Sequence, residues 1–360
     1  MPRASRQNPE VRDFILRNVA KHPGAIGSLV AQRFNLSRAA ISRYVHRLID
    51  EGLLEAEGKT NARRYRLKTL REELFAIEIF PGLPEHHVFR FRILPHLEGV
   101  AKNVIDICQY GFTEMLNNVV DHSGSAEAII QIRRDYARIE MTILDKGVGI
   151  FEKIKRDFHL PDYHSALLEL SKGKLTSDAA RHSGEGIFFT SRMFDTFSIL
   201  SGHLFYFRER QDDAEWLIGV NERPNETPGT SVIMSIATDA DWTTAQVFAK
   251  YQGDNLRFRN THVPIKLAPY PGEELVSRSQ AKRILARFDQ FSEVILDFEG
   301  VPTIGQAFAD EIFRVYANQH PDKRLVAVGT TPEVARMIAM VTAASGTVPP
   351  NVLYPDSERR

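Results

Sequence analysis

The 360-residue sequence contains a single cysteine, Cys108, so no disulfide can form within one chain. It has no run of about 20 apolar residues of the kind that crosses a bilayer, and its first residues lack the apolar core of a signal peptide. Its twelve histidines do not follow the spacing of a metal site. These absences exclude a disulfide-stabilised fold and predict a protein of the reducing cytoplasm that does not use a membrane as a partner.

The net charge of the chain is zero at pH 7, but the charges are unevenly distributed. Residues 1–70 carry 14 lysines and arginines against 6 aspartates and glutamates, a net charge of +8, whereas the remaining residues carry 32 against 40, a net charge of −8. A basic segment ahead of an acidic body is typical of a nucleic-acid-binding protein. A solvated basic surface without such a role would give the same counts.

The basic segment has the pattern of three helices and a hairpin. Apolar residues recur at helical spacing in three segments, 9–21, 26–34 and 38–51. Ser37 directly precedes the third segment and is a natural N-cap for it. Two alternating segments, 53–57 and 64–68, then flank an arginine-rich turn and predict paired strands.

This order of elements resembles the winged helix-turn-helix, and residues 26–54 carry the resemblance through their apolar positions and the closing Glu-Gly-Leu-Leu. In that family the third helix enters the major groove of DNA and the hairpin contacts the backbone or the minor groove. The resemblance implies DNA as a partner, with bases contacted by Arg38, Ser42 and Arg43 and phosphates by Arg63 and Arg64. Many winged helices mediate protein contacts only, and this alternative stays open, although the arginine-rich hairpin favours DNA.

A second pattern begins in residues 113–124, Thr-Glu-Met-Leu-Asn-Asn-Val-Val-Asp-His-Ser-Gly. On a long helix over 97–120, Glu114, Asn118 and His122 are four apart and lie on one face. The Asn118 amide oxygen can ligate Mg²⁺, while the Glu114 carboxylate can orient a water or a hydroxyl. An ordinary amphipathic helix with a polar face would show the same spacing.

Two glycine motifs follow this helix. Asp145 ends an expected strand and precedes Gly147 and Gly149. Its carboxylate can accept a hydrogen bond from the amino group of adenine, and the glycines let the backbone approach the ring. Gly184 and Gly186 open another expected helix, whose first N–H groups can bind an anion. The polar segment between the motifs is expected to hold one helix and then a basic loop that can fold over phosphates.

Together these motifs resemble the GHKL ATPase family, which includes gyrase and the histidine kinases. The resemblance is carried by Glu114-x-x-x-Asn118, Asp145-x-Gly147-x-Gly149, Gly184-x-Gly186 and Gly229-Thr230, and over 113–122 it is of the anti-sigma-factor serine kinase type. Two features of other family members are missing. There is no helix pair with a phosphoacceptor histidine, as in a sensor histidine kinase, and no transducer domain with a catalytic lysine of the gyrase type.

The resemblance implies a GHKL α/β sandwich that binds ATP and Mg²⁺. Asn118 would hold Mg²⁺, Glu114 would be the general base, and Asp145 would bind adenine with help from Thr230. The remaining cofactor-binding residues would be Gly147, Gly149, Lys174, Ser183, Gly184 and Gly186, with Lys172 and Arg181 as further contacts from the basic loop. His122 matches the motif but receives no role.

Residues 255–345 alternate strands and helices, which predicts an open sheet with helices packed against it. The stretch 294–316 resembles the STAS-like modules, in some of which a serine at a helix N-terminus accepts phosphate from a partner kinase. Ala307 occupies that position here, so we expect an interaction domain that is not phosphorylated, with nearby Thr303 as a weaker alternative acceptor. Residues 346–360 are expected to form a loose tail.

The sequence therefore predicts a multidomain α/β protein with a winged helix over 1–70, a GHKL ATP-binding domain over 71–240 and a STAS-like domain over 255–345. The favoured function is an ATP-responsive DNA-binding regulator in which ATP and Mg²⁺ close the basic loop over the site. The alternative is an anti-sigma-factor-like serine/threonine kinase acting on a separate protein, and slow ATP hydrolysis as a timer is a third reading. A protein partner for the STAS-like domain and a homodimer are both compatible with the sequence.

Overall fold

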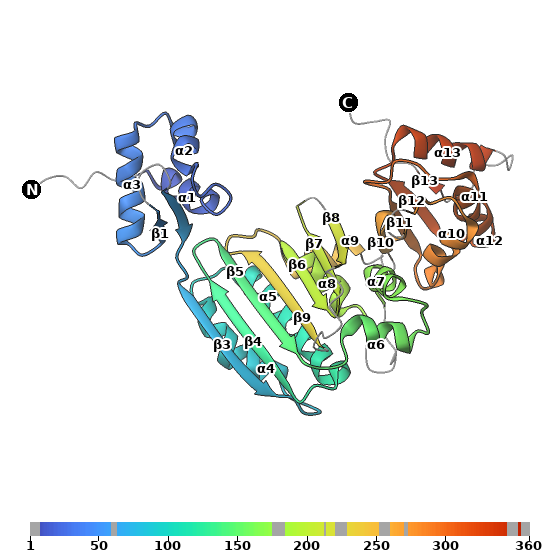
Figure 1. Ribbon diagram of the computed structural model, residues 1–360, viewed down its shortest axis with the longest axis horizontal. Helices are drawn as coiled ribbons and strands as arrows, with labels where there is room; N and C mark the ends of the chain where they lie inside the picture. The colour runs from blue at the N-terminus through green and yellow to red at the C-terminus, as the bar shows by residue number, and fades with distance from the viewer. Residues whose placement is uncertain are drawn as a thin grey trace, which may run out of the picture.

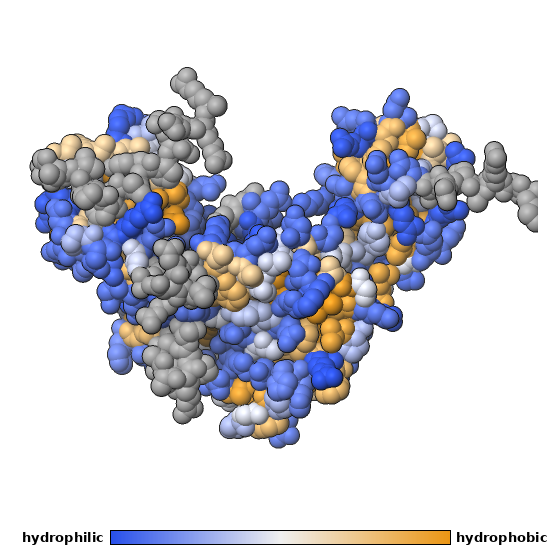
Figure 2. All heavy atoms as spheres, turned by 180° about the vertical axis from the view of Figure 1, so that it is seen from behind, coloured by the Kyte–Doolittle hydropathy of each residue, from blue (hydrophilic) through white to orange (hydrophobic). Residues whose placement is uncertain are grey.

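The computed structural model describes residues 8–58, 63–174, 184–211, 214–219, 229–251, 260–269, 273–343 and 352–353. They form an N-terminal winged helix, a central sheet with helices, and a C-terminal parallel sheet with its own helices (Figure 1). Seen from behind, the two outer parts stand apart on either side of the central one (Figure 2). The predicted multidomain α/β class is confirmed. In the part of the chain that the structure describes, no helix is long and apolar enough to cross a membrane.

The winged helix follows the sequence prediction closely. Its elements are α1 (Pro9–Asn18), α2 (Ile26–Phe34), α3 (Arg38–Asp50) and the antiparallel strands β1 (Leu54–Glu57) and β2 (Arg64–Leu67). The Ser37 hydroxyl accepts a hydrogen bond from the Ala40 N–H at 3.2 Å, which confirms the predicted cap of α3. A separate apolar core, which includes Ile15, Val30 and Val45, holds the three helices together.

The central sheet has seven strands in the order β3-β4-β5-β9-β6-β7-β8, and each neighbouring pair is antiparallel. The strands are β3 (Arg71–Glu78), β4 (Glu127–Arg134), β5 (Arg138–Asp145), β6 (Thr196–Ser201), β7 (Leu204–Glu209), β8 (Ala214–Gly219) and β9 (Thr230–Ala237). Buried residues alternate along them, as at Ile139, Met141 and Ile143 of β5, because successive side chains of a strand point to opposite faces.

The helices of the central part are α4 (Glu85–Val88), α5 (Lys102–Asn118), α6 (Ile150–Asp157), α7 (Tyr163–Lys172), α8 (Gly186–Met193) and α9 (Thr244–Tyr251). A π-helical turn (Phe89–Ile93) and a 3₁₀ turn (Leu94–Leu97) follow α4. The polar segment after Gly149 was predicted to hold one helix but holds two, α6 and α7. Helix α6 was missed although Phe151 and Ile154 lie at helical spacing, because eight residues are too few for a periodicity to be read with certainty from the sequence.

The C-terminal part is a parallel sheet in the order β10-β11-β12-β13, which confirms the predicted open sheet with helices. Its strands are β10 (Asn260–Pro264), β11 (Glu293–Asp297), β12 (Arg324–Val328) and β13 (Val352–Leu353). Its helices are α10 (Arg278–Leu285), α11 (Gln306–Asp310), α12 (Ala317–Gln319) and α13 (Pro332–Ala343), with a π-helical segment (Glu311–Tyr316) between α11 and α12. Residues 346–360 were predicted to form a loose tail, but two of them, Val352–Leu353, form β13. A two-residue strand is too short to produce a sequence pattern.

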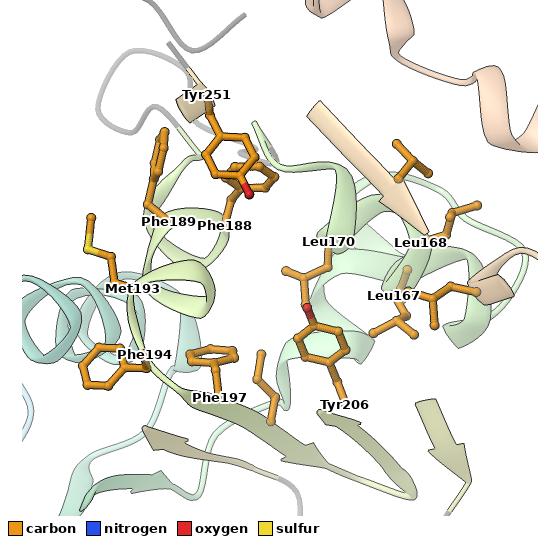
Figure 3. Packing of buried hydrophobic residues seen from close by; sticks show 14 of the residues in the cluster. Leu167, Leu168, Leu170, Phe188, Phe189, Met193, Phe194, Phe197, Tyr206 and Tyr251 are labelled. Atoms are coloured by element: carbon orange, nitrogen blue, oxygen red, sulfur yellow. The ribbon is translucent and has the colours of Figure 1, made fainter. Parts of the chain in front are cut away.

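Helix α7 lies between the central and the C-terminal sheets. All its residues from Ser165 to Lys172 are buried, which is typical of a helix that has packing partners on every side. Leu170 faces Tyr206 of β7, whereas Leu167 and Leu168 lie further towards the C-terminal part (Figure 3). Buried apolar residues of both parts form one continuous cluster, so the two domains predicted from the sequence share a core.

The winged helix contacts the turn between β4 and β5. Tyr136 of this turn packs against the winged-helix core, and its hydroxyl donates a hydrogen bond to the Asp13 carboxylate at 2.8 Å. Burial and this hydrogen bond raise the pKa of the Tyr136 hydroxyl. Arg17 forms an ion pair with Asp239, which follows β9. The winged helix is therefore attached at one end of β5 and β9.

Candidate functional site

A cavity lies between α5, α6 and the other end of β5 and β9. Much of its wall is apolar, with contributions from Met115, Val119, Ile150, Ile154, Ile187 and Val232. Polar groups reach the cavity at a few points, among them Asn118, His122, Asp145, Lys153 and Thr230. An apolar cavity with a small number of fixed polar groups is typical of a small-molecule site.

Asp145 is the most firmly held of these polar groups. It ends β5 directly opposite Thr230 of β9, and only 4% of its surface is exposed. Its Oδ1 atom accepts a hydrogen bond from the Gly147 N–H at 2.8 Å. Burial raises the pKa of the Asp145 carboxyl, and hydrogen bonds from the backbone N–H groups of Gly147 and Thr230 oppose part of this rise. The structure therefore places a buried carboxyl group in a fixed orientation at the cavity wall.

Ser201 supports the site, although it was not among the residues predicted from the sequence. It ends β6 directly opposite Thr230, and its hydroxyl donates a hydrogen bond to the Gly229 carbonyl at 2.8 Å. The Ile150 N–H donates to the hydroxyls of Ser201 at 3.1 Å and Thr230 at 3.0 Å, which fixes the start of α6. No motif contains Ser201, and its position next to Thr230 follows only from the strand order.

The glycines after Asp145 allow close backbone packing. A Cβ atom on Gly147 would lie 2.1 Å from the Ser123 carbonyl oxygen, and the Val148 N–H donates to that oxygen at 2.9 Å. Gly149 has a φ of +82°, and a Cβ atom there would lie 2.8 Å from the Ser201 hydroxyl. Both glycines are therefore required to fit the turn against its neighbours. Their predicted contact with a cofactor stays a prediction.

Asn118 is the last residue of α5, and a π-helical turn (Val119–Ser123) continues from it. Asn118 and His122 both line the cavity, on either side of the change from α- to π-helix. The side-chain nitrogen of Asn118 is buried, and it has no hydrogen-bond partner among the residues that the structure describes. A buried amide of this kind is expected to bond to a ligand or to water.

Glu114 lies beside the second glycine motif rather than on the cavity wall. A Cβ atom on Gly186, the first residue of α8, would lie 2.1 Å from its Oε2 atom. Burial raises the pKa of the neighbouring Tyr110 hydroxyl, and the charges of Glu114 and Glu185 raise it further. Burial also raises the pKa of the Glu185 carboxyl. Glu114 and Gly186 at the start of α8 therefore lie side by side, and Gly184 lies two residues before Gly186 in the chain.

The lysines that were predicted to contact the cofactor lie elsewhere in the structure. Lys172 is completely buried, so the expectation that it reaches into the site is wrong. Lys174 is bonded to the C-terminal part, where its ammonium donates to the Gln290 carbonyl at 2.7 Å. The cavity instead has Lys153 of α6, which is 2.6 Å from Asp157. Ser183 and Arg181 fall outside the described residues.

The predicted DNA-contacting residues lie on the outer surface of the winged helix. Ile41, Val45 and Leu48 bury one face of α3, and Arg38, Ser42 and Arg43 are exposed on the other. The Ser42 hydroxyl lies 3.1 Å from a ring nitrogen of His46. On β2, Arg64 is exposed, while the half-buried Arg63 lies over the Tyr65 ring at 5.5 Å.

Two parts of the chain match known families. Residues 14–64 match the model of the MarR family. The first domain is a MarR-family winged helix. Residues 280–335 match the model of a STAS-like domain of unknown function, DUF4325, so the C-terminal part is a STAS-like domain. Neither of these two matches covers the central sheet, and a comparison with curated proteins gave no match. A MarR-family winged helix joined to a STAS-like domain indicates a regulatory role.

Proposed function

We propose that the protein is an ATP-responsive DNA-binding regulator whose central domain is a GHKL-type ATP-binding domain. The observation that carries this proposal is the Asp145 carboxyl group at the end of an apolar cavity. Two backbone N–H groups fix its orientation, so it offers a hydrogen-bond acceptor at a defined position to a flat apolar ligand. The amino group of adenine is a suitable donor for this acceptor.

The residues around the cavity fit ATP with Mg²⁺. The buried side-chain nitrogen of Asn118 lacks a hydrogen-bond partner among the described residues, so it can donate to a ligand, and the oxygen of the same amide is a suitable ligand for Mg²⁺. When bound, Mg²⁺ would supply positive charge to the phosphates. Glu114 lies at the N-terminus of α8, where N–H groups favour an anion, and it would orient a water or hydroxyl there.

DNA binding is proposed for the winged helix because its exposed α3 face carries Arg38 and Arg43. These side chains suit the edges of guanine bases in the major groove, and Arg64 on the hairpin suits phosphates. None of the three residues takes part in the joint with the central domain, which is formed by Asp13 and Arg17 of α1.

Strands β5 and β9 provide a direct connection between the two sites. Asp145 and Thr230 lie at one end of this strand pair. The opposite end of the pair leads to Tyr136 and Asp239, which contact the winged helix. At that end the Thr238 hydroxyl donates to the Tyr136 carbonyl at 2.8 Å, which ties the two turns together. We propose that ATP changes DNA binding by shifting this joint. Such a shift requires that ATP binds the two arrangements of the domains with different affinity.

The test is the affinity of the full chain for a promoter fragment, measured with and without ATP and Mg²⁺. We expect the dissociation constant to change with ATP in the wild type, and to change in Asp145→Asn only at higher ATP concentrations. A DNA affinity that does not depend on ATP in the wild type would refute the regulatory part of the proposal.

A serine/threonine kinase acting on a separate protein is the second candidate, because Glu114 at the start of α8 could activate a hydroxyl as well as a water. Incubation with γ-labelled ATP, Mg²⁺ and a cell extract separates the two functions. Label on a protein that is lost in Glu114→Ala would favour the kinase, whereas free phosphate alone would favour slow hydrolysis.

A further inference from the structure

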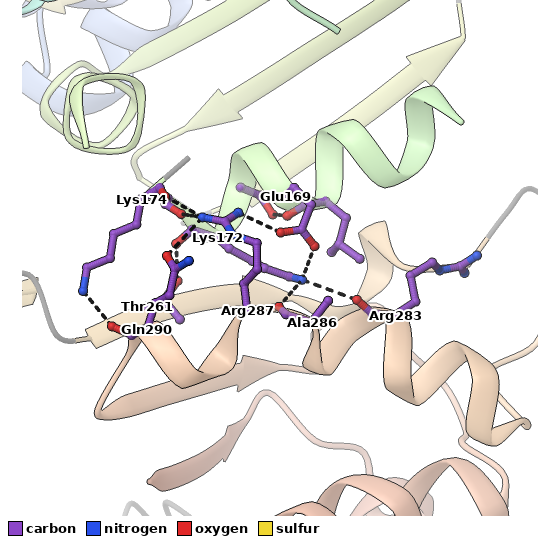
Figure 4. A network of polar contacts seen from close by, with 11 residues as sticks. Glu169, Lys172, Lys174, Thr261, Arg283, Ala286, Arg287 and Gln290 are labelled. Atoms are coloured by element: carbon purple, nitrogen blue, oxygen red, sulfur yellow. Dashed lines mark hydrogen bonds and ion pairs between the residues drawn. The ribbon is translucent and has the colours of Figure 1, made fainter. Parts of the chain in front are cut away.

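The STAS-like domain caps the C-terminal end of α7. The Thr261 hydroxyl of β10 donates a hydrogen bond to the Lys172 carbonyl at 2.6 Å, and Arg287 donates to the carbonyl oxygens of Gly173 and Lys174 (Figure 4). The last carbonyl groups of a helix have no partner within the helix and need one from elsewhere. For α7 this partner is the STAS-like domain, so the end of the helix depends on the docking of that domain.

A buried ion network reinforces the same contact. The Glu169 carboxylate lies 2.5 Å from the Lys172 ammonium and 2.8 Å from the Arg287 guanidinium. The side chains of Lys172 and Glu169 are 0% and 5% exposed, so this network is removed from water. The Lys172 ammonium also donates to the Ala286 carbonyl at 2.9 Å. Arg287 thus bonds both the side chain of Glu169 and the backbone that follows α7.

The backbone on both sides of the contact is held in an uncommon conformation. Lys174 and Arg287 have φ values of +52° and +62°, although neither residue is a glycine. Such left-handed residues are stabilised by their surroundings and are frequent at sites that switch between two arrangements.

Lys174 connects this contact to the nucleotide site. Its charge acts on Glu185, directly before Gly186, and opposes the rise that burial causes in the pKa of the Glu185 carboxyl. Helix α7, which ends two residues before Lys174, packs against α8, at whose start phosphates are expected. The Lys174 ammonium is nevertheless directed to the STAS-like domain, where it donates to the Gln290 carbonyl at 2.7 Å and lies 4.9 Å from the Phe291 ring centre.

We propose that docking of the STAS-like domain restrains ATP binding by holding Lys174 away from the phosphates. A bond from an ammonium to a phosphate is stronger than one to a neutral carbonyl. Lys174 can exchange one for the other only when Arg287 releases its backbone. Any partner that draws the STAS-like domain off α7 would then raise the affinity for ATP, and ATP would by reciprocity weaken the docking. This inference rests on the proposed nucleotide function.

The test measures the affinity of the full-length protein for a non-hydrolysable ATP analogue with Mg²⁺ by calorimetry. Arg287→Ala removes the hold on the Lys174 backbone while Glu169 keeps its partner Lys172, and we expect about three- to tenfold tighter binding. Lys174→Ala in the Arg287→Ala background should return the affinity to the wild-type value. Arg336→Ala is the matched control, since this arginine belongs to the same domain and pairs with Glu333 at the exposed surface.

If Arg287→Ala does not fold, Arg287→Lys keeps a positive charge beside Glu169 but offers fewer donors to the backbone, and it should also tighten binding. If the wild type binds the ATP analogue but the folded Arg287 variant binds it with unchanged or lower affinity, this inference is overturned. The proposed function is then left intact. Absence of analogue binding in the wild type overturns both.

Discussion

Replacing Glu169 by leucine tests whether α7 joins the central and STAS-like domains into one unit. The change leaves the buried charges of Lys172 and Arg287 without their carboxylate, although the Ala286 carbonyl still accepts from Lys172 at 2.9 Å. Removing one partner of a buried ion pair typically costs about 3 to 5 kcal/mol. We expect the free energy of unfolding of the shared core to fall by about that amount.

The assay is urea unfolding followed by tryptophan fluorescence. Trp242 packs against the shared core and Trp216 belongs to β8 of the central sheet, so neither tryptophan reports on the winged helix. Glu333→Leu removes one partner of an exposed ion pair in the same chain and should cost less than about 1 kcal/mol. A loss of less than about 1 kcal/mol in Glu169→Leu would refute the reasoning, because the network would then not be buried in solution.

The same experiment has a defined pH dependence. Burial lowers the pKa of the Lys172 ammonium, and the charge of Glu169 opposes this effect. Between this lowered pKa and the ordinary value of 10.5, the unfolded chain binds more protons than the native chain at this residue. The contribution of Lys172 to the free energy of unfolding therefore increases as the pH rises across this interval, and it is lost as the pH falls through it. Lys172→Met should remove this contribution, and the dependence should be absent from its unfolding curves.

Three other predictions concern the two sites and the joint between them. Ser201→Ala removes hydrogen bonds to Ile150 and Gly229, so calorimetry should show about three- to tenfold weaker ATP binding; unchanged affinity would remove Ser201 from the site. Tyr136→Phe removes the bond to Asp13, and limited proteolysis should cut the chain faster between the winged helix and the sheet; an unchanged rate would mean that this bond does not hold the joint. Arg43→Ala combined with Arg64→Ala should weaken DNA binding and, through the lost phosphate contact of Arg64, lower the salt slope by about 1, whereas Arg336→Ala should do neither.

Much of the fold could be predicted because the sequence patterns are local. The cap at Ser37 and the buried positions Ile41, Val45 and Leu48 define α3 without reference to the rest of the chain. Alternation along Ile139, Met141 and Ile143 defines β5 in the same way. Secondary structure of this kind depends on residues that are neighbours in sequence, so a single sequence contains the necessary information.

The parts that were missed depend on contacts between distant segments. Ser201 belongs to the site only because β6 lies next to β9 in the sheet, an order that no local pattern contains. The buried position of Lys172 results from the STAS-like domain packing on α7, and in the sequence this lysine resembles any basic loop residue. The π-turn after Asn118 is a similar case, because a change from α- to π-helix has no clear sequence signal.

Binding of ATP by the central domain through Asp145 is tested most directly by a comparison of ATP with GTP. Asp145→Asn keeps an oxygen that can accept from the Gly147 N–H, so the turn should remain intact, but the carboxylate is lost. The wild type should prefer ATP over GTP, since guanine presents a carbonyl where adenine presents its amino group. We expect this preference to disappear in Asp145→Asn and ATP binding to weaken by about 1.5 to 3 kcal/mol. Equal affinity of the wild type for both nucleotides, or no binding of either, would contradict the claim.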